Sequence, residues 1–215
     1  MGEEVGLRGY RVQDPDRSRA RRREVMLAAA EVLGESGYAA ATLEDVAARM
    51  GTSRAVIYYQ FRSKEDLYVE ICVEAVATAT ERLEEILALE LPPQETLREA
   101  LKALISGRAD PIIRASTSVG RPRQLAKESR ERIREADRRY EALLRGVIER
   151  GIEEGVFEPR DPKFVVYTLI FAINGSFIWR RPDGPLSDDY FVEELSEMLL
   201  NGVLAHPCAH HEHRD

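Results

Sequence analysis

The sequence predicts an all-α protein with a small N-terminal head of three helices and a larger helical body. Long segments carry apolar residues at three- and four-residue spacing, whereas alternating runs of β-branched residues are missing. Glycine and proline fall between these segments. With 44% hydrophobic and 32% charged residues over 215 positions, the chain can bury a sizeable core.

The head is expected over residues 18–63. Its helices are predicted at 18–35, 43–50 and 53–60. Gly37 and Gly51 end the first two, as glycine commonly does just past a helix C-terminus. Thr42 stands three residues before Asp45 and is expected to cap the second helix. Two short helices joined by a tight glycine turn form a helix-turn-helix arrangement.

The body is expected over residues 64–205. Ser63 and Pro93 are expected to begin helices, and Gly155 with Pro159 to stop a long charged one. Residues 112–122 are expected to be short and irregular. The predicted body helices span 64–89, 93–107, 123–154, 161–179 and 188–204.

Both ends of the chain are expected to be disordered, as a basic arm at 1–17 and a tail at 206–215. Residues 8–23 hold seven arginines and two acids. Two interpretations of this run stay open. It is either an arm that contacts the minor groove or the phosphates of a DNA duplex, or a solvated leader. The tail carries four histidines and Cys208, but no rigid element holds their spacing, so no metal site is expected.

The charge distribution separates the head from the rest of the chain. Residues 1–64 carry 11 Lys and Arg against 9 Asp and Glu, and the remainder carries 20 against 29, within a net charge of −7. This asymmetry indicates a basic end that meets an anion. The residues up to 204 contain no histidine, paired-carboxylate motif or phosphate loop, which argues against an enzyme. An adaptor that binds only protein would leave the positive head unexplained.

The third predicted helix has an inner and an outer face. Ile57 and Phe61 lie four apart and are expected to anchor it inward. Arg54, near the helix start, can bind guanine through two N–H groups. Small side chains allow close approach, and polar ones fix register on phosphates. The expected DNA-binding residues are Thr42, Thr52, Ser53, Arg54, Ala55, Val56, Tyr58, Tyr59, Gln60 and Lys64. The structural alternative is that the tyrosines cover a core.

The run TLEDVAARMGTSRAVIYYQFRSKEDLYVEI closely resembles the DNA-binding domain of the TetR family of transcriptional repressors. The resemblance covers about Arg23 to Ile71 and includes the T-x-x-[DE]-[VI]-A opening, the glycine turn, Tyr-Tyr-x-Phe and Lys-Glu-Asp-Leu. Gln60 replaces the usual His or Asn, and Ala55-Val56 the commoner Gly-Thr, which alters base preference. The resemblance implies a homodimer on a palindromic double-stranded operator, released by a small effector that binds in the body. A cytoplasmic location is expected separately, because Cys72 and Cys208 lie far apart without ligand spacing and the N-terminus lacks the apolar core of a secretory signal. An activator is equally compatible with the sequence.

The segment WRRPDGPLS at 179–187 resembles a branch of regulators that respond to acyl-CoA thioesters. Coenzyme A offers phosphates and an adenine, which suit arginines beside an aromatic face, and an acyl chain, which suits an apolar slot. The expected ligand-binding residues are Arg139, Tyr140, Phe171, Asn174, Phe177, Trp179, Arg180 and Arg181. No cofactor is expected besides this effector. In the alternatives the segment is an ordinary turn, or the body senses an apolar drug or metabolite.

The most apolar run, residues 164–179, is 16 residues long, whereas a membrane span needs roughly 20. It is therefore expected to be buried in protein, and no membrane partner is expected. Apolar and small residues repeat at helical spacing on the last two helices, as a dimer interface or a single-chain core would require. The expected dimer residues are Val165, Leu169, Ile173, Ser176, Leu195, Met198, Leu199 and Gly202.

Overall fold

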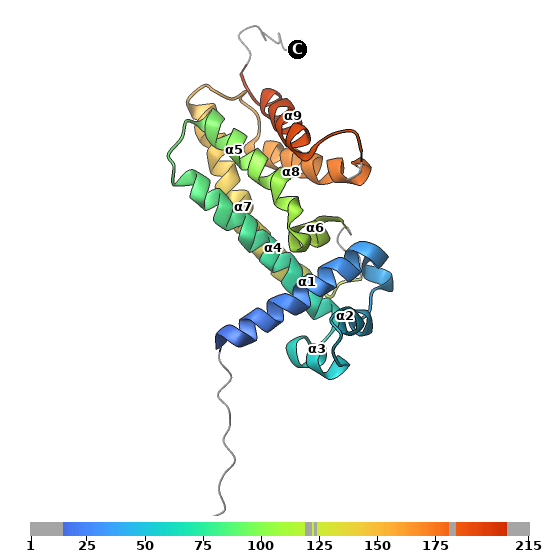
Figure 1. Ribbon diagram of the computed structural model, residues 1–215. Coiled ribbons are helices and arrows are strands. Elements are labelled where there is room, and N and C mark those ends of the chain that lie inside the picture. Colours follow the sequence, from blue (N-terminus) through green and yellow to red (C-terminus); the bar gives the residue numbers. More distant parts are fainter. Residues whose placement is uncertain (1–14, 119–121, 123, 181–183, 206–215) are drawn as a thin grey trace, which may run out of the picture.

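In a computed structural model, residues 15–118, 122, 124–180 and 184–205 are described. Over these ranges the chain forms nine α-helices, one short 3-10 helix and an isolated β-bridge. The helices are α1 (Pro15–Ala40), α2 (Leu43–Arg49), α3 (Arg54–Gln60), α4 (Lys64–Leu87), α5 (Pro93–Ser106), η1 (Gly107–Ala109), α6 (Pro111–Ser118), α7 (Lys127–Glu153), α8 (Pro162–Trp179) and α9 (Asp188–Asn201). In Figure 1, α2 and α3 lie at one end of the molecule and α9 near the other. The predicted all-α class is confirmed.

Local signals shape the head as the sequence predicts. The backbone N–H of Asp45 donates to Thr42 Oγ1 over 3.1 Å, and the N–H of Thr42 donates back to Asp45 Oδ2 over 2.9 Å, so two free donors at the start of α2 are satisfied. Gly37 and Gly51 have φ values of 73° and 59°, in the left-handed region that favours glycine. Gly37 places a kink inside the last part of α1. These turns fix the angles between α1, α2 and α3.

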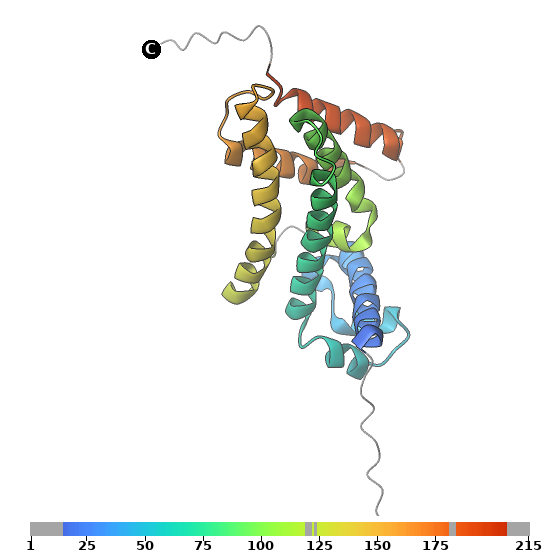
Figure 2. The ribbon, with the colours of Figure 1, turned by 90° about the vertical axis from the view of Figure 1, so that its left-hand side faces the viewer.

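The buried side chains form two clusters that cut across the expected boundary at residue 63. The head cluster joins α1, α2 and α3 to the first half of α4, to Ile112 and Ile113 of α6 and to Ile133 of α7. The body cluster joins the second half of α4 to α5, α7, α8 and α9. Helices α4 and α7 pack side by side and contribute to both clusters, as Figures 1 and 2 show. The head is therefore completed by helices that also belong to the body.

Helix α6 occupies residues 112–118 of the segment 112–122 that was expected to be irregular. Its first turn is stabilised by Asp110, whose Oδ1 accepts from the N–H of Ile112 over 2.8 Å. Ile112, Ile113 and Ala115 are buried in the head cluster. An eight-residue helix offers two turns of periodicity, which is too little to recognise from sequence. The helix α7 then begins at Lys127, four residues later than expected.

The end of α9 is fastened to the turn after α7. The N–H of Glu158 donates to the carbonyl of Val203 over 2.9 Å, and the N–H of Ala205 donates to that of Val156 over 3.0 Å. Phe157 is buried here against Gly151, where an added Cβ would lie 2.1 Å from the ring. This short pairing closes the body cluster at the end far from the head.

None of the described helices has the length and apolarity needed to cross a bilayer. Within the same ranges no three His, Cys, Asp or Glu side chains gather into a group that suits a metal ion. The tail histidines and residues 1–14 of the expected arm lie outside the described residues. Residues 15–17, also expected to be disordered, form the start of α1, which begins three residues earlier than expected.

Candidate nucleic-acid interface and ligand cavity

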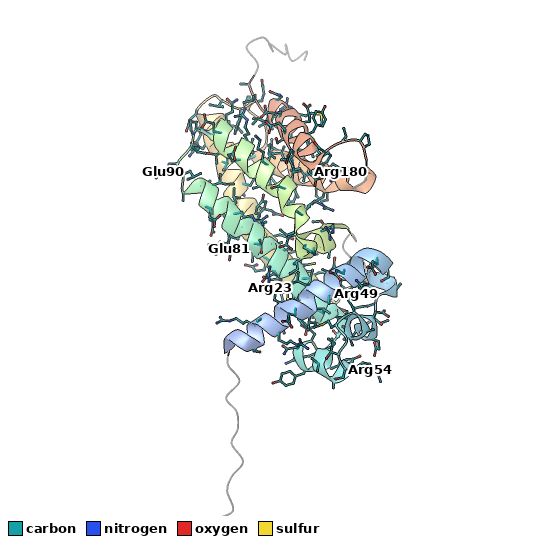
Figure 3. All side chains as sticks on the ribbon, in the orientation of Figure 1. Arg23, Arg49, Arg54, Glu81, Glu90 and Arg180 are labelled. Carbon is teal, nitrogen blue, oxygen red and sulfur yellow. The ribbon has the colours of Figure 1, made fainter. Side chains whose placement is uncertain are left out.

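The outer face of α3 presents an arginine and two tyrosines. The side chain of Arg54 is 68% exposed, and Tyr58 and Tyr59 are 50% and 67% exposed. Ile57 and Phe61 on the opposite face are buried in the head cluster. Figure 3 shows Arg54 at the outer end of the head, on the side away from the body. A nucleic-acid duplex can therefore approach this face without displacing any core residue.

The other expected DNA-binding residues differ in how accessible they are. Ser53 and Ala55 are exposed, whereas Thr52, Val56 and Gln60 are half-buried. The hydroxyl of Thr42 is held by Asp45, to which it donates over 2.7 Å while accepting from the backbone. Thr42 therefore caps α2, as expected from the sequence. The same hydroxyl was also expected to contact DNA, and in this structure it is already engaged by Asp45.

Lys64 also has a structural role within the head. Its Nζ donates to the carbonyls of Tyr38 and Ala39 over 2.8 and 3.2 Å and lies 4.7 Å from the centre of the Tyr38 ring. These contacts hold the segment after Gly37 against the start of α4. Of the three ammonium N–H groups, one is left for a phosphate. The main contacts of Lys64 therefore stabilise the segment after Gly37, a role that is not apparent from the sequence.

Arg22 belongs to the arginine-rich run at 8–23, but its contacts place it in the head. Its Nη1 donates to the carbonyl of Gln60 over 2.6 Å, and its guanidinium lies 4.1 Å from the centre of the Phe61 ring. Arg22 thus fixes the C-terminal end of α3. No local signal marks this role, because the partners are 38 residues apart.

Glu70 connects Arg22 to the body. Its Oε1 lies 3.4 Å from Arg22 Nη2 and also accepts from Arg132 on α7. Nearby, Oε1 of Glu65 accepts from the N–H of Ala126 over 2.8 Å, just before α7 begins. Polar contacts therefore run from the end of α3 through α1 and α4 to α7.

A small cavity lies where the head and body clusters meet. Its walls come from α4, α5, η1, α6 and α7. They are Ala79, Arg82, Leu83, Ile86, Ala100, Ala103, Leu104, Gly107, Ile113 and Tyr140. The volume of the cavity is about 20 Å³, enough for about one water molecule. Ile113 belongs to the head cluster, whereas Leu83, Ala100 and Tyr140 belong to the body cluster. Any larger occupant must therefore spread the junction.

Two of the residues that line the cavity, Tyr140 and Arg82, carry polar groups. Burial raises the pKa of the Tyr140 hydroxyl above its ordinary range, so it stays a neutral donor. The half-buried Arg82 approaches Gly107, where an added Cβ would lie 2.9 Å from its Nη1. Beside Gly107, burial and the charge of Arg114 lower the pKa of Arg108 to about 10. This wall suits an anionic or carbonyl group attached to an apolar body.

Of the expected ligand-binding residues whose side chains are described, Tyr140 is the one that lines this cavity. Arg139 is exposed, and its Nε and Nη2 donate to Oε1 of Glu84 over 2.9 and 2.6 Å. Phe171 is 69% exposed, so its assignment to an interior acyl slot is wrong. Asn174 is half-buried. The side chains of Phe177 and Trp179, and Arg181 as a whole, lie outside the described residues.

Arg180 is held at the junction of α8 and α9. Its side chain is 14% exposed, lies 4.7 Å from the centre of the Phe191 ring and pairs with Asp188. Its buried Nε has no hydrogen-bond partner. In this arrangement Arg180 fastens α8 to α9 (Figure 3), and it is not among the residues that line the cavity.

The residues of α8 expected in the dimer interface lie on the face that packs inside the chain. Val165, Leu169, Ile173 and Ser176, with Leu195 of α9, are buried in their own chain and cannot meet a partner subunit. Leu199 is half-buried, whereas Met198 and Gly202 are exposed as expected. Because α8 is apolar around its whole circumference, periodicity could not distinguish its two faces.

A different, mostly apolar set of side chains is exposed on these two helices. We call this set the α8–α9 stripe; its members are Phe164, Thr168, Phe171 and Ala172 on α8, with Tyr190 and Met198 on α9. On α8 they repeat every three or four residues and so share one side of the helix. An exposed row containing several large apolar side chains is typical of a surface that another protein covers.

Comparisons with known proteins place this geometry in a family. The model of the C-terminal domain of tetracyclin repressor-like proteins matches residues 90–203, more than half of the chain, and that of bacterial regulatory proteins of the tetR family matches residues 25–71. A regulator from Thermobifida fusca, described as of the TetR/AcrR family, superposes with a TM-score of 0.67 at 31% identity, covering 85% of this chain and 98% of its own.

Two further relatives have described roles. The HTH-type transcriptional repressor KstR2 of Mycobacterium tuberculosis is 26% identical, covering 86% of this chain and 93% of KstR2. The fatty acid metabolism regulator protein of Bacillus subtilis is 27% identical, covering 84% and 94%. The structure of FadR from Bacillus subtilis, solved with stearoyl-CoA, has the same fold at a TM-score of 0.71 and 24% identity, covering 84% of this chain and 98% of its own.

Proposed function

The chain belongs to the tetR family of bacterial regulatory proteins, and on this basis we propose that it is a homodimeric repressor released from its operator by an acyl-CoA thioester. The observation that carries the DNA-binding part is the division of α3, with Ile57 and Phe61 buried and Arg54, Tyr58 and Tyr59 exposed. A helix held by its inner face presents its outer face to base edges and phosphates. No catalytic role is assigned, and DNA as the partner implies a cytoplasmic protein.

The second subunit would cover the α8–α9 stripe. Two heads must lie about 34 Å apart to enter successive major grooves on one side of a duplex. A symmetric pair of stripes provides one self-complementary interface, in which each Phe171 meets the same surface of the partner. This assignment replaces the buried residues expected from sequence and keeps Met198.

The effector would enter the cavity at the junction of the two clusters. An acyl chain does not fit in about 20 Å³, so the effector must separate α4, α5 and α7 from α6. Because α6 and the start of α7 complete the head cluster, this separation changes how the heads are held. A ligand that binds the spread form better shifts the population away from DNA in proportion to its differential affinity.

The chemistry of the wall supports a thioester. Tyr140 can donate to a carbonyl oxygen, Arg82 can pair with an anionic group, and the remaining wall is apolar. The relationship to the fatty acid metabolism regulator points the same way. Arg139 and Arg180 stay candidates for the phosphates, although each now pairs with a carboxylate. The alternative effector is an uncharged apolar drug or metabolite, for which Arg82 would be incidental.

The experiment begins by selecting duplexes from a random library with the full-length protein. The selected duplex is then used in mobility-shift titrations with acyl-CoAs of increasing chain length, the matching free acids and coenzyme A. Release by thioesters at concentrations where acid and coenzyme A have no effect would support the proposal. Release by uncharged apolar molecules alone would support the alternative, and failure to enrich any palindrome would overturn the DNA-binding part.

A further inference from the structure

The outer face of α3, with Arg54, Tyr58 and Tyr59, is called the reading face below. Beside Arg54 on this face lies an acidic side chain that the proposed function does not use. Glu44, in the first turn of α2, accepts through Oε1 from Nη1 of Arg54 over 3.1 Å. We infer that Glu44 is a positioning residue that aims Arg54 at a guanine and weakens binding to unrelated DNA. This inference rests on the proposed binding of α3 to a duplex.

The geometry leaves Arg54 able to bind a base while it is held. A guanidinium has five N–H donors in a planar fork, and the contact with Glu44 uses one nitrogen. The other two nitrogens stay available for O6 and N7 of guanine. An arginine side chain has many rotamers, and a neighbouring carboxylate that limits them reduces the entropy lost on binding.

The pair contributes little to holding the head together. Leu43, Val46 and Ala47 of α2 already pack with Ile57 of α3 in the head cluster. Both side chains of the pair are largely exposed, and such ion pairs add little to stability. By contrast, Arg22 and Arg23 pair with acids on α4, away from the outer face of α3. The position of the Glu44–Arg54 pair on the reading face therefore points to recognition.

A carboxylate on this face has a second effect. It repels phosphates on any sequence, so it lowers non-specific affinity, which depends mainly on charge. On the right sequence, the better-aimed Arg54 offsets this repulsion. A side chain that penalises wrong partners and aligns the group that recognises the right one increases the difference between the two affinities.

The test uses the full-length protein and the duplex selected as above. Dissociation constants at fixed salt are measured for that duplex, for each single base-pair replacement and for an unrelated duplex. The proteins are the wild type, Glu44→Gln, Arg54→Ala and the double variant. We expect Arg54→Ala to reduce discrimination at one G·C pair by about ten- to a hundredfold. Glu44→Gln should reduce discrimination at the same pair by roughly three- to tenfold and tighten binding to the unrelated duplex.

These opposite changes distinguish positioning from a structural role, because a damaged head would bind both duplexes more weakly. In the double variant, Glu44→Gln should have no further effect at that pair. The control is Glu31→Gln, which removes the same charge from a carboxylate that accepts from Arg49 over 2.9 Å. It should leave discrimination unchanged.

Four results would overturn the inference. Additive losses at two different base pairs would mean that Glu44 reads a base itself. Equal effects of Glu44→Gln and Glu31→Gln would mean that net charge alone matters. If no duplex is enriched, the proposed function fails and this inference fails with it, whereas a selected duplex whose discrimination is unaffected by Glu44→Gln refutes this inference alone.

Discussion

The head and the body use their polar side chains differently. In the head, Thr42 with Asp45 and Lys64 with the carbonyl of Tyr38 fix the turns around a core whose cavity is about 10 Å³. In the body, Tyr140 and Arg82 are among the residues that line a cavity of about 20 Å³ at the junction of the clusters. A head held by these local contacts can keep its reading face in one geometry, whereas the larger cavity at the junction allows the body to respond to a ligand. The difference suggests that recognition and response are separated, although the two parts share α4, α6 and α7.

The variant Phe61→Ala tests whether the head and the body, which share α4, α6 and α7, unfold together. Removing a fully buried aromatic side chain should lower the free energy of unfolding by about 3–5 kcal/mol. Because the head cluster includes Ile112 and Ile133, we expect one cooperative transition in urea, followed by both circular dichroism and Trp179 fluorescence. Tyr59→Ala, on the exposed face, is the control and should change stability by less than about 0.5 kcal/mol. Two separated transitions would show that the head folds on its own.

The next largest effect is expected at the α8–α9 stripe. Phe171→Glu places a charge in the centre of the proposed interface and should weaken dimerisation by about 2–4 kcal/mol. Sedimentation at micromolar concentration should then show a monomer with unchanged helicity. Leu89→Glu alters a similarly exposed apolar side chain in the turn after α4 and should leave the dimer intact. A dimeric Phe171→Glu protein would contradict the assignment of the stripe.

Within the body, Gly151→Ala tests the tight packing at the end far from the cavity. The new methyl group would collide with the Phe157 ring, which is buried, so the free energy of unfolding should fall by about 1–3 kcal/mol. Gly146→Ala in the same helix meets nothing within 4 Å. It should raise stability by up to about 1 kcal/mol through helix propensity. Thermal denaturation of both variants gives the comparison, and equal shifts would mean that Phe157 moves freely.

The smallest effect is expected where the two regions are joined. Glu70→Gln removes the charge shared by Arg22 and Arg132. We expect nearly unchanged affinity for DNA alone but a coupling between effector and DNA that is weaker by about 0.5–2 kcal/mol. The measurement is the ratio of DNA dissociation constants with and without effector. Glu81→Gln, an exposed carboxylate on the same helix, is the control (Figure 3). An unaltered ratio would exclude Glu70 from the coupling.

What could be predicted from the sequence follows the range of the interactions. Thr42 and Asp45 are three residues apart, and their cap was predictable because both partners lie in one local pattern. Arg22 meets the carbonyl of Gln60 across 38 residues, and no window of sequence contains both. The dimer face failed for another reason. Apolar residues surround α8, so Ile173 and Phe171 looked alike until packing buried one and exposed the other.

The cavity was beyond the sequence for a related reason. Arg82 lies in the middle of α4 and belongs to no sequence motif. It becomes a cavity residue only because Gly107 of η1 and Tyr140 of α7 line the same space. Tyr140 was expected near a ligand because of its arginine neighbours, yet Arg139 turns toward Glu84 outside the cavity. Adjacent positions on a helix point in different directions, so a run of suitable residues rarely forms one site.

The pairing of Phe157 with Leu204 has a consequence for synthesis on the ribosome. The head cluster needs nothing beyond Ile133, whereas the body cluster needs Leu200 and Val203. Since chains fold from the N-terminus as they emerge, a nascent polypeptide would display Arg54 and its tyrosines before it has a closed body or an α8–α9 stripe. Such a single head offers half of a two-fold contact with DNA. Translation thus delivers the reading face early, and dimerisation gives it useful affinity only after the end of the chain is fastened.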